Sequence, residues 1–178
     1  SYTYKLEKFS ARVGTRLEHT NASIKYNGDP AFTQKPFTNL VPAVTLSYQT
    51  TPSSNVQLSY TQRISRPDIT YLNPFRNVSD PKNISQGNPD LFPEISNSFN
   101  LNYNLFTQKF NFNTSLSTSF ANNSIEQVSM LLDTVVLSTY ENIGHSRRTG
   151  LSTYLRWQVT KDFNWYFNGF ARYSYYSY

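Results

Sequence analysis

Apolar and polar side chains alternate along much of this chain. In residues 55–65, Val56, Leu58, Tyr60 and Ile64 alternate with Asn55, Gln57, Ser59, Thr61, Arg63 and Ser65. Because successive side chains of a β-strand point to opposite faces of the sheet, this pattern predicts a strand with one apolar and one polar face. The same alternation recurs in five further stretches: 9–18, 40–49, 98–105, 110–120 and 151–160.

Two of the expected strands are unusually long. Residues 108–130 and 134–160 can each form one strand, with a hairpin tip at 131–134 and a bulge near Gly144. At about 3.3 Å per residue, such strands exceed the usual length of about 5–6 residues in soluble sheets several-fold. This length favours membrane strands that continue into an extracellular hairpin.

The expected connections alternate between short and long. Tight polar turns are expected at 6–8, 51–54, 106–108 and 161–162, whereas 27–38, 66–94 and the tip at 131–134 are long or projecting. If the strands run up and down in sequence, all tight turns fall on one rim and all long connections on the other. Outer-membrane barrels have this asymmetry, with short periplasmic turns and long extracellular loops. A soluble sandwich gives no reason for it.

The number of strands indicates an incomplete barrel. A stub at 2–5 precedes roughly seven long strands, and the last of them, 163–178, runs toward the loop rim. Bacterial single-chain barrels have an even strand number and end at the turn rim. We therefore expect an all-β fold in which residues 1–178 are part of an antiparallel up-and-down transmembrane β-barrel, with 66–94 as a long extracellular loop.

Composition narrows the function classes. The chain is 38% hydrophobic and 16% aromatic but only 15% charged, and no apolar run approaches the roughly 20 residues of a membrane helix. The net charge is +5, yet Lys and Arg are scattered, so no nucleic-acid partner is expected. With no cysteine and two isolated histidines, no metal or other cofactor is expected. The chain has no phosphate loop, nucleophile elbow or paired carboxylates, so it is not expected to be an enzyme.

Residues 65–103 carry an ordered set of short motifs. They are Ser65-Arg66-Pro67, Tyr71-Leu72-Asn73-Pro74-Phe75, Gly87-Asn88-Pro89-Asp90-Leu91 and Pro93-Glu94, followed by a serine-containing strand. This order resembles the barrel region of TonB-dependent-receptor-like outer-membrane proteins, and residues 14–20 and 39–48 resemble the strands that precede it in that family. The resemblance spans nearly the whole chain.

The resemblance implies a receptor in the outer membrane of a Gram-negative bacterium. In that family, a plugged barrel binds a scarce nutrient outside the cell and releases it inward with energy from the TonB system. The implied partners are outer-membrane lipid, a plug domain and TonB, both missing from this chain. A surface lipoprotein is a further candidate partner. The implied ligand is a small molecule, a peptide or a glycan.

Two arginines at a strand end are the first candidates for ligand binding. Arg63 and Arg66 could line a lumen and attract anionic ligands. The alternative, which we favour, is that they pair with Asp68 or Glu94 and hold the loop in place.

Polar and aromatic residues of the 66–94 loop are the second set of candidates. Asn and Asp side chains could bind sugar hydroxyls, and aromatic rings could stack on sugars. Asn and Asp also form turns, especially next to Pro or Gly, and this alternative is the more common one. The candidates are Tyr71, Asn73, Phe75, Asp80, Asn83, Asn88 and Asp90.

Aromatic residues gather around the turn at 161–162. They are Trp157, Phe163, Trp165, Tyr166 and Phe167, and Tyr173, Tyr175, Tyr176 and Tyr178 would lie at the opposite rim. The cluster fits a periplasmic aromatic girdle, or alternatively the core of a sandwich. Two other functions stay open: a passive porin or structural outer-membrane barrel, and a soluble carbohydrate-binding β-sandwich with its apolar side chains sealed between two sheets.

Overall fold

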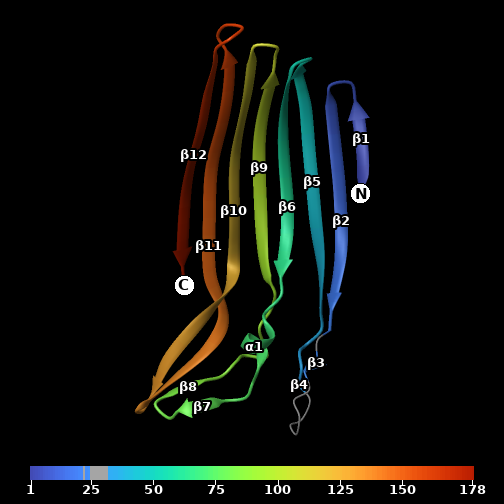
Figure 1. Ribbon diagram of the computed structural model, residues 1–178. Coiled ribbons are helices and arrows are strands. Elements are labelled where there is room, and N and C mark those ends of the chain that lie inside the picture. Colours follow the sequence, from blue (N-terminus) through green and yellow to red (C-terminus); the bar gives the residue numbers. More distant parts are fainter. Residues whose placement is uncertain (22, 25–31) are drawn as a thin grey trace.

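Most of the chain forms one twisted antiparallel sheet (Figure 1). The computed structural model describes residues 1–21, 23–24 and 32–178. Its principal strands are β1 (Tyr2–Leu6), β2 (Phe9–Thr20), β5 (Phe37–Thr51), β6 (Ser54–Ser65), β9 (Glu94–Phe106), β10 (Phe110–Leu132), β11 (Val135–Gln158) and β12 (Asn164–Ser177). They pair in this order, each antiparallel to the next. The predicted stub and seven long strands are confirmed.

The tight turns and the long connections lie at opposite ends of this sheet. Figure 1 shows the β1–β2, β5–β6, β9–β10 and β11–β12 turns together at the top and the longer connections at the bottom. We call these ends the turn rim and the loop rim. Their separation confirms the sorting predicted from connection lengths.

The connections at the loop rim contain short elements that the alternation pattern did not predict. They are β3 (Ser23–Ile24), β4 (Phe32–Thr33), α1 (Ile69–Leu72), β7 (Asn77–Asp80) and β8 (Asn83–Ser85). Strands β3 and β4 pair only with each other. Residues 27–31 of the predicted 27–38 loop lie outside the described residues.

Strand β8 pairs in parallel with residues 136–138 of β11. The antiparallel partner of β11 on this side, β12, extends only as far as the pair His145–Ser177. The 66–94 loop therefore supplies a partner to the part of β11 that β12 does not reach.

A bulge divides the β10–β11 hairpin into two parts. The register shifts between Ala121 and Ser124 and again between Ser124 and Glu126, with Ser124 opposite Gly144. A Cβ at Gly144 would lie 2.7 Å from Glu126 Cγ, so the strands approach closely here and a larger residue would require the Glu126 side chain to move. The bulge predicted near Gly144 is confirmed, and beyond it the hairpin twists away from the sheet (Figure 1).

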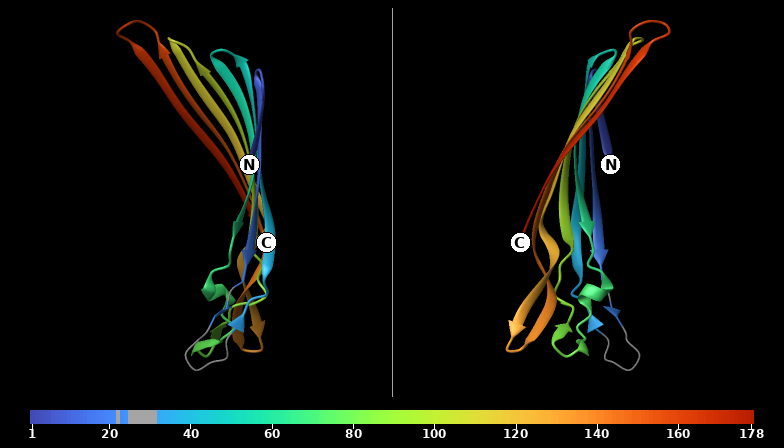
Figure 2. Two further views of the ribbon diagram at one scale, coloured as in Figure 1. Left: turned by 90° about the vertical axis from the view of Figure 1, so that its right-hand side faces the viewer. Right: turned by 60° about the vertical axis from the view of Figure 1, so that its left-hand side comes forward.

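The sheet is a single layer, so its apolar side chains have no second sheet to pack against (Figure 2). Leu58, Leu101 and Leu151 are 43%, 44% and 47% exposed. In the described part of the chain, only Val41, Leu72, Leu91 and Ala121 are buried apolar residues. The two-sheet sandwich is therefore wrong, and the open sheet matches the predicted incomplete barrel.

Two regions are distinguished below. The wall comprises β1, β2, β5, β6, β9 and β12 together with β10 and β11 on the turn-rim side of their bulge. The cap comprises residues 66–93 together with the β10–β11 hairpin beyond the bulge.

Candidate functional site

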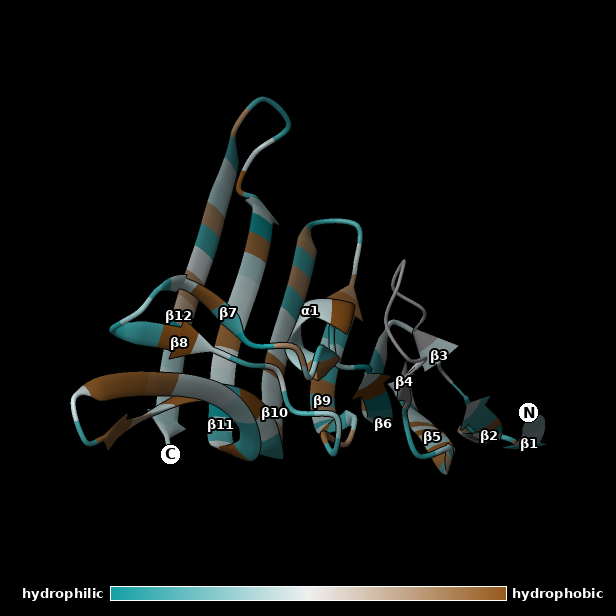
Figure 3. Ribbon diagram, turned by 90° about the horizontal axis from the view of Figure 1, so that it is seen from below, coloured by the Kyte–Doolittle hydropathy of each residue, from teal (hydrophilic) through white to brown (hydrophobic). Residues whose placement is uncertain are grey.

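The register sorts the side chains of the wall into two faces. Directly opposite residues of paired strands share a face. One row reads Ala11, Leu46, Leu58, Leu101, Leu116, Leu151 and Ala171, and the next row toward the turn rim reads Ser10, Ser47, Gln57, Asn102, Ser115, Ser152 and Phe170. Figure 3 shows the resulting alternation of hydropathy along the strands. The predicted apolar and polar faces are confirmed, with Phe170 as an aromatic exception on the polar face.

A cavity of about 350 Å³ on the polar face contains three arginines. They are Arg63 on β6, Arg148 on β11 and Arg172 on β12. No carboxylate is among the residues that line this cavity. Three cations in a cavity with no carboxylate in its lining produce a positive potential, which attracts anions.

The three arginines differ in their contacts. Arg148 Nε donates to the Tyr176 hydroxyl at 2.9 Å, and its guanidinium lies 5.6 Å from the centre of that ring. Arg172 lies 5.0 Å from the centre of the Phe170 ring. Arg63 makes no hydrogen bond or ion pair with the described residues. The aromatic contacts orient two guanidinium groups without neutralising them.

Arg66 pairs with a different carboxylate from those predicted. Its Nη2 lies 2.8 Å from Glu18 Oε2, and its Nε donates to Thr20 Oγ1 at 2.9 Å. Arg16 also forms an ion pair with Glu18. The predicted pairing with Asp68 or Glu94 is wrong because those carboxylates are already used: Asp68 caps α1, and Glu94 accepts from the backbone N–H of Ile125.

Tyr71, Asn73 and Asn88 come together in the cap. The Gly87 N–H donates to Asn73 O at 2.8 Å, and the Asn88 N–H donates to Tyr71 O at 2.7 Å. The Tyr71 ring stacks on Tyr140 of β11 at 4.3 Å, and Asn88 Nδ2 donates to Tyr140 O at 2.9 Å. These groups fasten the loop to the hairpin.

Asp80 and Asn83 close the turn between β7 and β8. Asp80 Oδ2 accepts from Asn83 Nδ2 at 2.7 Å, and Asp80 Oδ1 accepts from the Lys82 N–H at 2.9 Å. These bonds, the one from Asn83 above all, hold the pKa of Asp80 below its ordinary value of 3.8. Both residues therefore act as turn formers, as the alternative interpretation states.

The remaining loop candidates are more exposed. Asp90 forms an ion pair with Lys35 at 2.7 Å, and both side chains are largely exposed. Phe75 is 38% exposed, and its N–H donates to Asn73 Oδ1 at 3.1 Å. Of the nine predicted residues, only Arg63 lines the polar-face cavity, while the other eight lie in residues 66–90.

Sequence reasoning missed Arg148 and Arg172. Arg148 could have been found from the sequence. It is separated by an even number of residues from Ser152 and Arg156, which the alternation places on the polar face. The face of Arg172 could not be predicted from β12 alone, because aromatic residues occupy both faces of that strand. The register with β11 places Arg172 opposite Gly150, on the polar face.

Two asparagines that were not predicted hold the cap together. Asn142 Nδ2 donates to Phe92 O at 3.0 Å and to Asn123 O at 3.0 Å, while Asn142 Oδ1 accepts from the Phe92 N–H at 2.9 Å. Asn123 Nδ2 donates to Pro93 O at 2.7 Å. These amides replace strand pairing where the hairpin bulges.

The aromatic cluster lies at the turn rim on the apolar face. Trp157 and Trp165 are direct partners, and with Val159 and Phe163 they line an apolar hollow of about 270 Å³. The Trp165 and Phe167 rings stack at 6.2 Å. This arrangement is the one expected of a girdle. Tyr166 departs from it, because it lies opposite Arg156 on the polar face.

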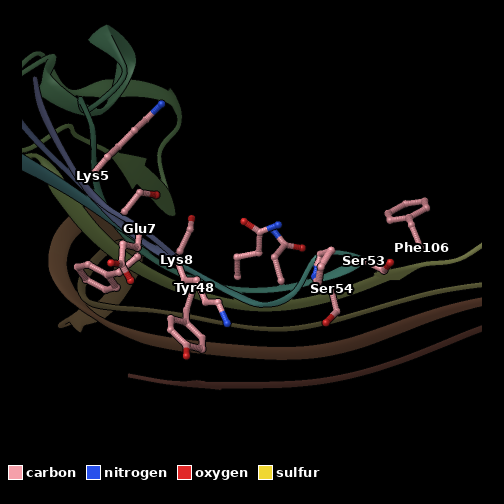
Figure 4. A pocket seen from close by; sticks show the side chains of 13 residues that line it. Lys5, Glu7, Lys8, Tyr48, Ser53, Ser54 and Phe106 are labelled. Carbon is pink, nitrogen blue, oxygen red and sulfur yellow. The ribbon is translucent and has the colours of Figure 1, made fainter.

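A further hollow of about 530 Å³ lies at the turn rim near β1. Figure 4 shows Lys5, Glu7, Lys8 and Tyr48 at one part of it and Ser53, Ser54 and Phe106 at another. Its lining combines both charge signs, in contrast to the cavity that contains the three arginines.

The described residues contain no group of three or more His, Cys, Asp or Glu placed to hold a metal ion. Among these residues, no helix is long and apolar enough to cross a membrane.

A curled wall with an apolar face, a polar face, and rims of short turns and long loops defines an outer-membrane β-barrel segment. The whole chain, residues 1–178, matches the model of the outer membrane protein beta-barrel family, and the chain belongs to that family. The resemblance found in its motifs is thereby confirmed, and the protein is located in the Gram-negative outer membrane.

Several solved structures share this fold. The siderophore receptor PirA from Pseudomonas aeruginosa is 15% identical, with a TM-score of 0.63 over 93% of this chain and 35% of that one. The ferric enterobactin receptor PfeA from Pseudomonas aeruginosa, as a Q482A mutant with enterobactin, is 15% identical, with a TM-score of 0.63 over 90% of this chain and 26% of that one. The copper transporter OprC is 13% identical, with a TM-score of 0.67 over 97% of this chain and 27% of that one.

These similarities show the fold alone. The chain spans about a quarter to a third of the length of these three structures. No curated protein matches the sequence.

Proposed function

We propose that this chain forms part of the barrel of an outer-membrane receptor that binds an anionic nutrient and takes it up through a plugged lumen with TonB-derived energy. The observation that carries the proposal is the cavity containing Arg63, Arg148 and Arg172 on the polar face. Because the apolar face meets lipid, the polar face lines the lumen, where a solute would pass.

The loop rim supports a receptor role. The cap is held by the asparagine and backbone bonds described above, so this rim carries a folded surface on the extracellular side. Receptors of siderophores and a copper transporter share the fold. In this proposal, a plug domain and TonB are partners, and the protein is not an enzyme.

Uptake by cells tests the proposal. Cells with and without the full-length protein would be grown in a defined mixture of anionic nutrients, and depletion of each compound would be measured by mass spectrometry. We expect at least one compound to be depleted only by cells that carry the protein, and a protonophore to abolish that depletion. Depletion that continues with the protonophore present would identify a passive porin instead.

Substitutions test the role of the cavity. Arg63→Gln and Arg148→Gln should each weaken uptake about tenfold at low ligand concentration, because each removes a charged hydrogen-bond donor. Lys161→Gln, in the β11–β12 turn, removes the same charge at the opposite rim and is the control. Equal uptake by all three variants would contradict the assignment of the cavity.

A further inference from the structure

The apolar face of the wall has one charged side chain, and it lies toward the loop rim. Within the paired strands, Arg147 is the one Lys, Arg, Asp or Glu on this face, and it lies opposite Phe120 on β10 and Tyr175 on β12. His145 lies two residues further along the same face of β11, and His19 lies on the same face at the loop end of β2. All three therefore lie toward the loop rim.

The depth of Arg147 can be estimated from the girdle. Trp157 lies on the same face of β11, ten residues nearer the turn rim. Ten residues rise about 33 Å along a strand, which is roughly 25 Å along the membrane normal at a tilt of about 40°. The apolar band of an outer-membrane barrel is also about 25 Å tall. Arg147 therefore lies at the outer boundary of the hydrocarbon, where lipid headgroups begin.

Arg147 lies in a hollow of about 580 Å³ on the apolar face. Phe99, Phe120, His145 and Tyr175 line this hollow with it. The Phe99 and Phe120 rings stack at 6.3 Å, and Tyr60 extends this row of rings at 4.8 Å from Phe99. The lining of the hollow thus combines one cation with aromatic rings. The residues come from β9 to β12, which are neighbours in the sheet.

The guanidinium of Arg147 has no hydrogen bond or ion pair with any described residue. Its neighbour in sequence, Arg148, points to the other face and donates to Tyr176. An unpaired charge beside hydrocarbon is costly, so the group needs a counter-charge from outside the chain. At this depth, the available anions are the phosphates of outer-leaflet lipid headgroups.

We propose that Arg147 binds the phosphate of a phosphorylated outer-leaflet lipid, with His145 as a second polar contact and with Phe120 and Tyr175 against the lipid body. A guanidinium matches phosphate with two parallel N–H···O bonds, which an ammonium group cannot form. Rings at the membrane boundary pack against the apolar part of the lipid. The proposal requires only that the wall is embedded in the membrane, so it is independent of any transported ligand.

Lipid retention measured by native mass spectrometry tests the site. The full-length protein in detergent would be titrated with bisphosphorylated lipid A and, separately, with the same lipid after removal of both phosphates. We expect the phosphorylated form to bind about tenfold more tightly to the parent protein. Equal binding of the two lipids would overturn the proposal, and this comparison needs no variant to fold.

Substitutions test whether Arg147 is the residue that gives the preference for phosphorylated lipid. Arg147→Gln should remove the preference for phosphorylated lipid, and Arg147→Lys should restore only part of it. Arg156→Gln removes the same charge from the opposite face of β11 and should leave lipid binding unchanged. An unaltered preference in Arg147→Gln, or an equal loss in Arg156→Gln, would contradict the assignment.

Inorganic phosphate separates a lipid site from a phosphate site. If millimolar phosphate alone displaces lipid A from the parent protein, the hollow binds free phosphate and the lipid assignment is wrong. If lipid A stays bound under these conditions, the aromatic contacts contribute as proposed.

Discussion

The wall and the cap are built from the same chain but are held together differently. In the wall, long backbone ladders connect neighbouring strands, with one register shift between β5 and β6 near the turn rim. In the cap, side-chain amides bond to backbone groups, as Asn142 does with Phe92, and Leu72 and Leu91 are buried at 4% and 3% exposure. The wall depends on lipid to cover its apolar face, whereas the cap has a small core of its own.

This difference predicts which substitutions each region tolerates. The wall should be sensitive to the polarity of a side chain on one face and insensitive on the other. The cap should be sensitive to the shape and hydrogen bonding of single residues, because few contacts hold it.

The largest effect is expected from a charge on the apolar face of the wall. Leu101→Arg should destabilise the folded full-length protein in lipid vesicles by about 2–4 kcal/mol, because the charge would lie near the middle of the bilayer. Asn102→Arg, the next residue on β9, places the same charge on the polar face and is the control. Denaturant titration measures both, and equal destabilisation would contradict the two-faced wall.

A smaller effect, confined to the cap, is expected at Gly87. A Cβ there would lie 2.5 Å from Asn73 O and 2.6 Å from Tyr71 O, and both atoms belong to the backbone. Gly87→Ala should therefore destabilise the docked loop by about 1–3 kcal/mol. Hydrogen exchange should increase in residues 69–91 and stay unchanged in β9.

Gly150→Ala is the matched control for this substitution. Its Cβ would lie 3.2 Å from the Ser117 hydroxyl, which can rotate away. If Gly87→Ala increased hydrogen exchange throughout the wall, the wall and the cap would not be independent of each other.

Removal of the Asn142 amide should have a more modest effect. Asn142→Ala deletes three hydrogen bonds, but water can reach the exposed Phe92 backbone groups, so we expect a loss of about 1 kcal/mol in the docking of residues 88–93. Limited proteolysis near Phe92 measures this loss. Ser129→Ala, which removes one exposed hydroxyl pair on the same hairpin, is the control.

The smallest effect is a pH dependence of the cap. Bonds from the Thr70 N–H and hydroxyl hold the pKa of Asp68 below its ordinary value of 3.8. Because the pKa of Asp68 is lowered in the folded protein, the Asp68 carboxylate stabilises α1 at pH values above 3.8. This stabilisation is lost as the pH falls through the lowered pKa. Exchange of the Thr70 amide should rise over that range, and Asp68→Asn should remove this dependence.

The wall could be predicted from the sequence because its pattern is periodic and local. Each strand has its own alternation, and the bulge at Gly144 and the tip at Asp133, with a φ of 54°, follow from residues nearby. The short strands and the helix of the cap could not be predicted this way. For example, β8 exists because residues 136–138 lack a partner on one side, which only the assembled sheet shows.

Only part of the candidate site could be predicted, because local alternation reveals single residues and not their grouping across strands. Arg63 was found because it stands in an alternating strand, but its grouping with Arg148 and Arg172 depends on the register of β9, β10, β11 and β12. The partner of Arg66 is 48 residues away at Glu18, and nothing local to Arg66 indicates it.

The bulge opposite Gly144 also affects how this protein can diverge. A strand in contact with lipid can gain or lose residues only in pairs, because a single insertion would exchange its two faces. The bulge interrupts this coupling, and beyond it the hairpin contacts the 66–93 loop instead of continuing the wall. The hairpin beyond the bulge can therefore vary in length by odd or even steps while the alternation of the wall is inherited unchanged.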